Sequence, residues 1–74
     1  MAEPVKYTVI IERYDTGYGA YVPDLPGCGA TGRTDMEVRE RIQTAIEVHL
    51  RSMREDGDPI PQPNSIAATV EVAA

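Results

Sequence analysis

The chain has 74 residues, which is enough for one small domain with a modest hydrophobic core, so we expect residues 1–74 to form a single domain. Its formal net charge is −5, which argues against a protein that binds nucleic-acid backbones and favours a basic partner. The single cysteine excludes an internal disulfide, and no apolar run approaches the roughly 20 residues that a membrane helix needs. No leader precedes the domain, so we expect a cytoplasmic protein without a membrane partner.

The first predicted elements are two strands joined by a tight turn. Apolar side chains occupy every second position from residue 5 to residue 11, which is typical of a strand with one buried face. Asp15-Thr-Gly17 then supplies a glycine where a hairpin turn needs a positive φ. Residues 18–22 alternate again, so we expect a second strand that pairs antiparallel with the first.

A proline- and glycine-rich corner follows the second predicted strand. Pro23 and Pro26 have no N–H to donate to a ladder, so the sheet should lose its regularity there. The glycines around this corner permit bends on either side of a short third strand, which we expect near residues 28–31.

The next predicted element is a long helix. Thr34-Asp-Met-Glu37 is a capping box, in which Thr34 should accept the N–H of Glu37 and the Glu37 carboxylate should accept the N–H of Thr34. Gly57 fits the left-handed position after a helix and Pro59 prevents continuation, so the helix should end near Asp56. The residues expected to form its apolar stripe, which should lie on the sheet, are Val38, Ile42, Ala45, Ile46, His49, Leu50 and Met53.

The predicted layout ends with a fourth strand. Residues 59–63 contain three prolines and should be extended and stiff, carrying the chain back to the sheet. Residues 66–72 alternate apolar and other side chains, which predicts a strand. The pattern as a whole predicts an α+β fold with the order β-β-β-α-β, an antiparallel sheet and one long helix packed on one face.

The search for catalytic chemistry favours ordinary structural roles. His49 lies on or beside the apolar stripe, where packing explains it better than a general base. Cys28 has no neighbouring cation in the sequence, so a quiet, partly buried thiol is favoured over a nucleophile. The acidic residues lack the spacing of a calcium loop, and one His and one Cys cannot form an ordinary tetrahedral zinc site. We expect no catalytic residue, no metal site and no cofactor.

All four tyrosines fall in the first predicted hairpin. Alternation places Tyr7 and Tyr18 on the core side of the sheet and Tyr21 on the other side. Tyrosine is also a common anchor of protein interfaces, because its ring is rigid and apolar and ends in a hydroxyl. For Tyr14 and Tyr21, cross-strand packing and partner binding stay open as alternatives.

Residues 18–28, read as YGAYVPDLPGC, together with the helix opening at 34–37 and the segment 55–63, resemble the HicB-like antitoxins of prokaryotic toxin–antitoxin pairs. The resemblance extends over about residues 7 to 72. It implies a partial ribonuclease-H-like fold, in which one helix crosses a curved sheet and the carboxylate set of true ribonucleases H is absent.

The resemblance also implies a partner. Antitoxins of this family neutralise a HicA-like toxin, a small basic RNA-cleaving protein, by covering its surface, and a C-terminal module usually binds DNA. The chain stops at Ala74 after the last predicted strand, so we expect no direct DNA binding. We expect the partner contacts around the turn and second strand, at the positions Tyr14, Asp15, Tyr21, Asp24 and Leu25.

Two other functions stay open. One is an orphan homo-oligomer, a dimer or tetramer without a toxin, whose exposed strand edges pair between subunits because a single core is small. The other, least favoured, is residual ribonuclease-H-like hydrolysis with Mg²⁺ held by carboxylates.

Overall fold

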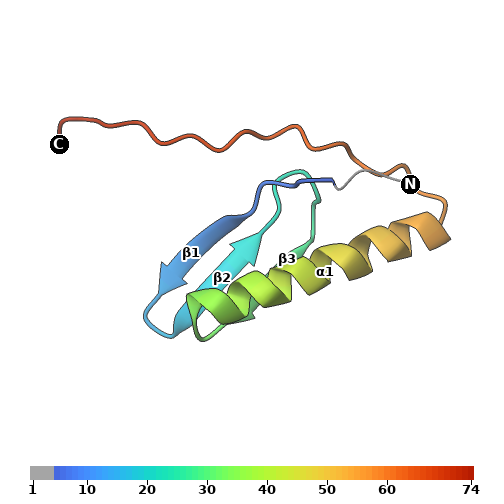
Figure 1. The fold of residues 1–74 in the computed structure, drawn as a ribbon, viewed down its shortest axis with the longest axis horizontal. Coiled ribbons are helices and arrows are strands. Elements are labelled where there is room, and N and C mark those ends of the chain that lie inside the picture. The colour runs from blue at the N-terminus through green and yellow to red at the C-terminus, as the bar shows by residue number, and fades with distance from the viewer. Residues whose placement is uncertain (1–4) are drawn as a thin grey trace.

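The computed structural model describes residues 5–74, so the first four residues of the predicted domain lie outside the described part. Three strands form one antiparallel sheet in the order β1-β2-β3, and a single long helix lies across it (Figure 1). The elements are β1 (Ile10–Tyr14), β2 (Gly17–Tyr21), β3 (Gly29–Gly32) and α1 (Asp35–Glu55). The predicted α+β class, with an antiparallel sheet and one helix, is confirmed.

The first two strands form the expected hairpin. Tyr14 pairs with Gly17, and the register runs to Ile10 opposite Tyr21. Gly17 has a φ of 145°, and a Cβ at this position would lie 2.5 Å from the carbonyl oxygen of Gly32. The first strand begins at Ile10 and not at residue 5, because β2 ends at Tyr21 and leaves the preceding residues without a ladder partner.

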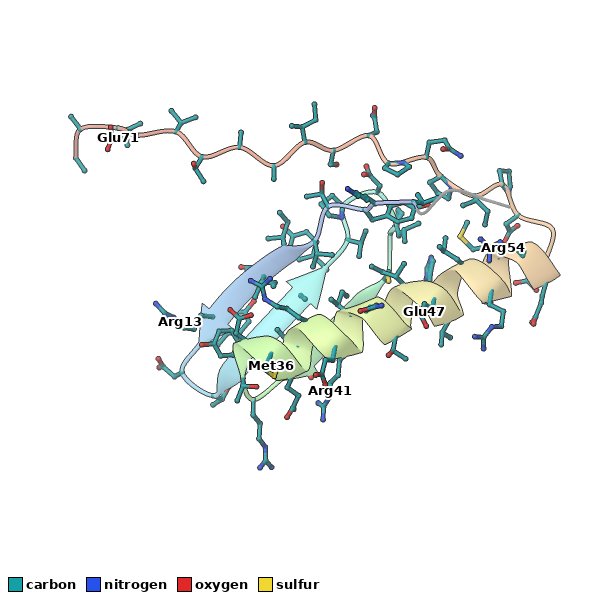
Figure 2. All side chains as sticks on the ribbon, in the orientation of Figure 1. Arg13, Met36, Arg41, Glu47, Arg54 and Glu71 are labelled. Atoms are coloured by element: carbon teal, nitrogen blue, oxygen red, sulfur yellow. The ribbon has the colours of Figure 1, made fainter. Side chains whose placement is uncertain are left out.

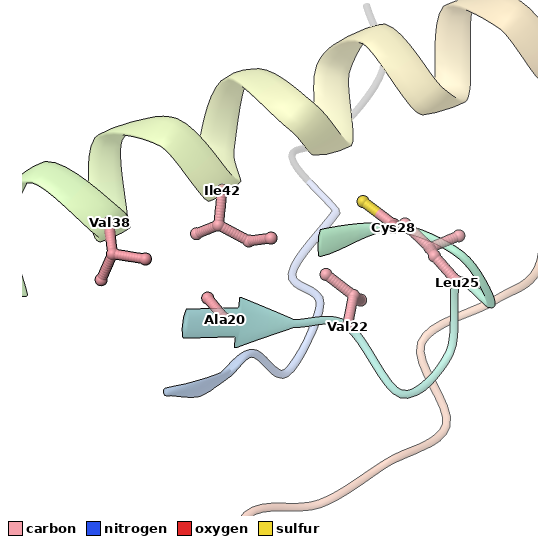
Figure 3. Packing of buried hydrophobic residues seen from close by; sticks show 6 residues of the cluster. All are labelled: Ala20, Val22, Leu25, Cys28, Val38 and Ile42. Atoms are coloured by element: carbon pink, nitrogen blue, oxygen red, sulfur yellow. The ribbon is translucent and has the colours of Figure 1, made fainter. Parts of the chain in front are cut away.

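Two consecutive turns connect β2 to β3. The N–H of Leu25 donates to the carbonyl of Val22 at 3.0 Å, and the N–H of Cys28 donates to the carbonyl of Leu25 at 3.0 Å. Each turn has a proline at its second position, and Gly27 adopts a φ of 83° in the second turn. The double turn brings the side chain of Leu25 into the core (Figure 3).

The helix begins as predicted, with one correction to its cap. The N–H of Glu37 donates to Oγ1 of Thr34 at 3.0 Å. The Glu37 carboxylate does not return to the N–H of Thr34; it accepts the N–H of Arg33 at 3.2 Å and pairs with Arg41 at 3.1 Å. The predicted capping box was therefore half wrong, because the carboxylate meets the preceding amide and a cation one turn further along the helix.

The helix ends as predicted. Asp56 is the C-cap and Gly57 adopts a φ of 74°. The N–H of Gly57 donates to the carbonyl of Arg54, and the N–H of Asp58 donates to that of Met53. These two bonds form a Schellman motif, which satisfies carbonyls that the last turn would leave unpaired.

The core lies between α1 and the strands β2 and β3, and the helix does not lie over β1. The helix lies close against β3 at Gly32, where a Cβ would lie 2.7 Å from the backbone nitrogen of Val38. The predicted stripe on α1 is buried at Val38 and Ile42 and only half-buried further along, so the second half of the helix overhangs the sheet. Among residues 5–74, the buried residues are Ala20, Val22, Leu25, Cys28, Val38 and Ile42 (Figure 3).

The predicted fourth strand was wrong for the single chain. Residues 66–72 are extended but pair with no strand, and their side chains are exposed. The segment before them is held in place by side chains: the hydroxyl of Tyr7 donates to the carbonyl of Pro61 at 2.6 Å, and that of Thr8 donates to the carbonyl of Ser65 at 2.9 Å. Beyond Ser65 the chain leaves the sheet (Figure 1).

Within residues 5–74, no helix combines the length and the apolar character needed to span a membrane.

Candidate partner-binding surface

The two faces of the sheet differ in what covers them. Ile11 lies opposite the buried Ala20 and belongs to the face beneath α1. Alternate residues point to the other face, which no helix or strand of residues 5–74 covers. We call this surface the open sheet face, and its residues are Ile10, Glu12, Tyr14, Gly19, Tyr21 and Thr31.

Two predicted partner contacts, Tyr14 and Tyr21, lie on the open sheet face. Tyr14 is 56% exposed and Tyr21 is 46% exposed. The ring of Tyr14 lies over Gly19, where a Cβ would come within 3.1 Å of the ring carbon Cε2. Tyr14 therefore packs across the strands and still presents about half of its surface to solvent. The same exposed surface is available to a partner.

The charged residue on the open sheet face itself is acidic, whereas Arg33 and Arg41 line a hollow beside Tyr14. Glu12 is exposed on the face and Asp15 is exposed in the adjoining turn. Arg41 lies near the hairpin end of the sheet, but its guanidinium already pairs with Glu37 and donates to the carbonyl of Thr31 at 3.1 Å. Acidic groups beside two exposed phenol rings suit a basic protein surface.

Asp24, a third predicted contact, is occupied by the chain itself. One carboxylate oxygen accepts the backbone N–H groups of Asn64 and Ser65 at 3.0 Å each, and the other accepts the Ser65 hydroxyl at 2.9 Å. The N–H of Asn64, followed by that of Ser65, lowers the pKa of the Asp24 carboxyl below its ordinary value of 3.8. The side chain fastens residues 64–65 to the loop between β2 and β3.

Leu25, another predicted contact, has no exposed surface. Its side chain lies in the core, so we leave it out of the proposed surface. The sequence does carry a signal that Leu25 is buried. Leu25 is a large apolar residue close to two turn-forming prolines, and burying its side chain away from water is favourable.

The sequence reasoning also missed four positions that matter here. Ile10 and Glu12 belong to the open sheet face. Ile10 is the cross-strand partner of Tyr21, so the hairpin register would have identified it. Tyr7 and Thr8 hold residues 61–65, and their long-range bonds leave no local pattern in the sequence.

The groups considered for catalysis lie elsewhere. Cys28 is buried, and this burial raises the pKa of its thiol above the ordinary 9.0, so the unreactive thiol form is favoured. His49 is half-buried on α1 and borders the same shallow groove as Cys28. Over residues 5–74, no three His, Cys, Asp or Glu side chains are grouped so that they could hold a metal ion.

Comparison with known proteins decides the family. Residues 7–73 match the family model described as the HicB-like antitoxin of bacterial toxin–antitoxin systems. The chain belongs to the HicB-like antitoxin family. This HicB-like chain is 39% identical over 67 residues to a UPF0150 protein of Thermoplasma acidophilum, with 89% of the chain and 97% of that protein covered.

Further relatives of the HicB-like chain include a phage protein and a solved structure. An uncharacterized 14.9 kDa protein of Haemophilus phage HP1 is 38% identical over 60 residues, with 81% of the chain covered, and the chain spans 45% of its length. A structure described as a HicA3 and HicB3 toxin–antitoxin complex matches with a TM-score of 0.70 at 28% identity, covering 81% of this chain and 70% of that one.

Proposed function

We propose that this HicB-like chain is a protein-binding antitoxin module that neutralises a small, basic, RNA-cleaving toxin of the HicA type by masking its surface. The observation that carries the proposal is the open sheet face, where two half-exposed tyrosines lie beside acidic groups. The similar HicB3 structure is a complex with a HicA3 protein, which supports a partner of the same kind.

The proposed contact set follows from where the structure places each residue. Tyr14 and Tyr21 would supply the central apolar contacts, since exposed tyrosines are common interface anchors. Asp15 and Glu12 would meet Lys and Arg side chains of the toxin, in keeping with the net charge of −5. Asp24 would act indirectly, by placing the segment 64–65 beside this surface.

The proposed action is binding without catalysis, in the cytoplasm and without a cofactor. Hydrolysis through Mg²⁺ would need carboxylates that converge on one point. Within residues 5–74 no group of three such side chains could hold a metal ion, so the hydrolysis alternative has no structural support there. Direct DNA binding is not part of the proposal, because the negative charge of the chain opposes contact with phosphates.

The direct test is a pull-down of the tagged chain from its native host at moderate salt, followed by mass spectrometry and light scattering. We expect a small basic protein in fixed stoichiometry, whose purified form cleaves RNA until this chain is added. A recovered partner that is neither basic nor inhibited by the chain would contradict the proposal.

The contact surface makes the first prediction. Tyr21→Ala and Tyr14→Ala should each weaken binding of the purified toxin by more than about 1 kcal/mol, or roughly fivefold in Kd, because each removes an exposed ring from the centre of the surface. Met36→Ala is the matched control, because Met36 is an exposed apolar residue on α1, away from the open sheet face. Titration calorimetry measures all three affinities. Unchanged affinity in both tyrosine variants would remove this face from the proposal.

The orphan homo-oligomer is the second candidate function. The observations that favour it are a small core, with six buried residues in the described part of the chain, and an exposed apolar segment at residues 66–72. In the same pull-down, recovery of the chain alone as a defined oligomer, from a host that produces no basic partner, would favour this candidate over the antitoxin.

A further inference from the structure

The C-terminal arm, defined as residues 66–74, exposes apolar side chains that a folded chain normally buries. Ile66 is 90% exposed, Val70 is 81% exposed and Val72 is 75% exposed. The arm is extended and runs apart from the sheet and helix, and Figure 2 shows Glu71 near its far end. A regular alternation of apolar residues in an extended, unpaired segment is the pattern of a strand that lacks its sheet.

The sheet has an edge that matches this arm. In the order β1-β2-β3, β1 pairs only with β2, so its outer N–H and C=O groups have no ladder partner within residues 5–74. An edge of this kind is a ready template for another strand. The strand β1 has five residues, Ile10–Tyr14, whereas residues 66–72 number seven and would span about 23 Å as a strand. The arm is therefore long enough to pair along the whole of β1.

A groove runs beside the same edge because α1 lies over β2 and β3 and leaves β1 uncovered. Two adjoining hollows form it, and they share Gln43 and Ile46 of the helix. The apolar residues that line it are Val5, Tyr7, Val9, Ile11, Ile42, Ile46 and Leu50. A strand added to β1 would place every second side chain in this groove.

The charge around the groove differs in sign from that of the whole chain. Lys6, Arg39 and Arg54 line it with one acidic residue, Glu47, and Arg39 is paired with Asp35, which leaves an excess of one positive charge in a chain whose net charge is −5. The only charged side chain of the arm is Glu71. The charge of the arm therefore does not oppose its approach to this edge of the sheet.

The segment just before the arm is fastened to its own chain. The hydroxyl of Tyr7 donates to the carbonyl of Pro61, and that of Thr8 donates to the carbonyl of Ser65. Asp24 adds three more bonds to Asn64 and Ser65. These bonds fix the point where the arm begins, and from there the arm runs away from the sheet and helix of its own chain (Figure 1).

We propose that the arm of one copy adds as an edge strand to β1 of a second copy and places alternate apolar side chains in the groove between β1 and α1. Reciprocal exchange makes a closed two-fold dimer in which both exposed arms and both β1 edges are covered. The exchange completes in trans the four-stranded order that the sequence pattern predicts. It does not depend on the proposed toxin, so failure of either idea leaves the other standing.

The first test is the oligomeric state of the full chain by sedimentation and light scattering across a range of concentrations. We expect a dimer for the unaltered chain and for the control Met36→Lys, and at least a tenfold weaker dimer for Val70→Lys, because the arm can no longer enter the groove. Met36 and Val70 are both exposed apolar residues, at 73% and 81%. Both variants should keep the circular dichroism of the helix. A monomer for the unaltered chain at high micromolar concentration, or equal dimerisation of all three proteins, would overturn the proposal.

The second test locates the arm by disulfide trapping between two differently tagged chains. One chain carries a cysteine in the arm, at Ala67, Thr69 or Glu71, and the other carries Lys6→Cys at the edge of the sheet. We expect a cross-link between the two tags under mild oxidation, and none when Val48→Cys on the exposed side of α1 replaces Lys6→Cys.

Two results of the trapping would contradict the exchange. A cross-link within one chain that carries both cysteines, with no product between the two tags, would mean that the arm fills its own groove. Trapping of arm to arm alone, with no product involving Lys6→Cys, would mean that the two arms pair with each other.

Discussion

At the scale of single residues, two glycines allow backbones to come closer than any side chain would permit. Gly17 closes the hairpin beside the carbonyl of Gly32, and Gly32 in turn lies against the first turn of α1 at Val38. The sequence pattern identifies Gly17 from its place in the turn. The requirement for glycine at position 32 cannot be read from the sequence, because it comes from a tertiary contact between β3 and α1.

Gly17→Ala should destabilise the protein by about 1–3 kcal/mol, because the residue holds a φ that side chains rarely adopt and its Cβ would meet a carbonyl oxygen. Gly27→Ala is the matched control. Gly27 also has a positive φ, but a Cβ there has open space around it, so only conformational strain is added. Urea unfolding followed by circular dichroism measures both, and an equal or smaller loss for Gly17→Ala would contradict the close contact seen at the hairpin.

Asp24 and Leu25 show why neighbouring loop residues are hard to assign from sequence. They are adjacent, yet one carboxylate holds the chain near its C-terminal end and the other side chain fills the core. Alternation predicts sidedness only in a strand, and these residues lie in consecutive turns, where the direction of each side chain depends on the turn geometry.

At the scale of elements, α1 is the best predicted part of the chain. Its start at Thr34 and its end at Gly57 come from bonds between residues at most five apart, so the determining signals lie within one or two turns of the chain. The register of the hairpin is likewise set by a two-residue turn. Elements of this kind are encoded locally and can be located from one sequence.

Thr34→Ala should lower the free energy of unfolding by about 1 kcal/mol, because the N–H of Glu37 loses its acceptor at the start of the helix. Thr34→Ser keeps the hydroxyl and should retain most of the stability. Thermal and urea unfolding give both values. A loss as large in the serine variant would show that the threonine methyl, and not the hydrogen bond, contributes the stability.

At the scale of the whole molecule, the ionised Asp24 carboxylate ties residues 64–65 to the sheet. The folded state lowers the pKa of this carboxyl below 3.8, so its contribution is fully present above that pH and is lost as the pH falls through the folded value. Amide signals of Asn64 and Ser65 should therefore titrate with a midpoint below 3.8 in NMR spectra. In Asp24→Asn this titration should vanish and both amides should exchange faster with solvent; a midpoint at or above 3.8 in the unaltered chain would contradict the anchoring role.

The alternation, caps and turns of the sequence by themselves determine the hairpin, the helix, the α+β class and the positions of two exposed tyrosines, because these features depend on residues close together along the chain. Only the tertiary structure decided that Leu25 is core, that Asp24 is an anchor and that residues 66–72 leave the sheet of their own chain. The burial of Leu25 depends on a core shared with the helix residues Val38 and Ile42, and the other two outcomes depend on contacts between residues about 40 to 57 positions apart, such as Asp24 with Asn64 and Thr8 with Ser65. Alternation shows that the arm can form a strand, but a strand needs a partner edge, and no local pattern says which edge that is.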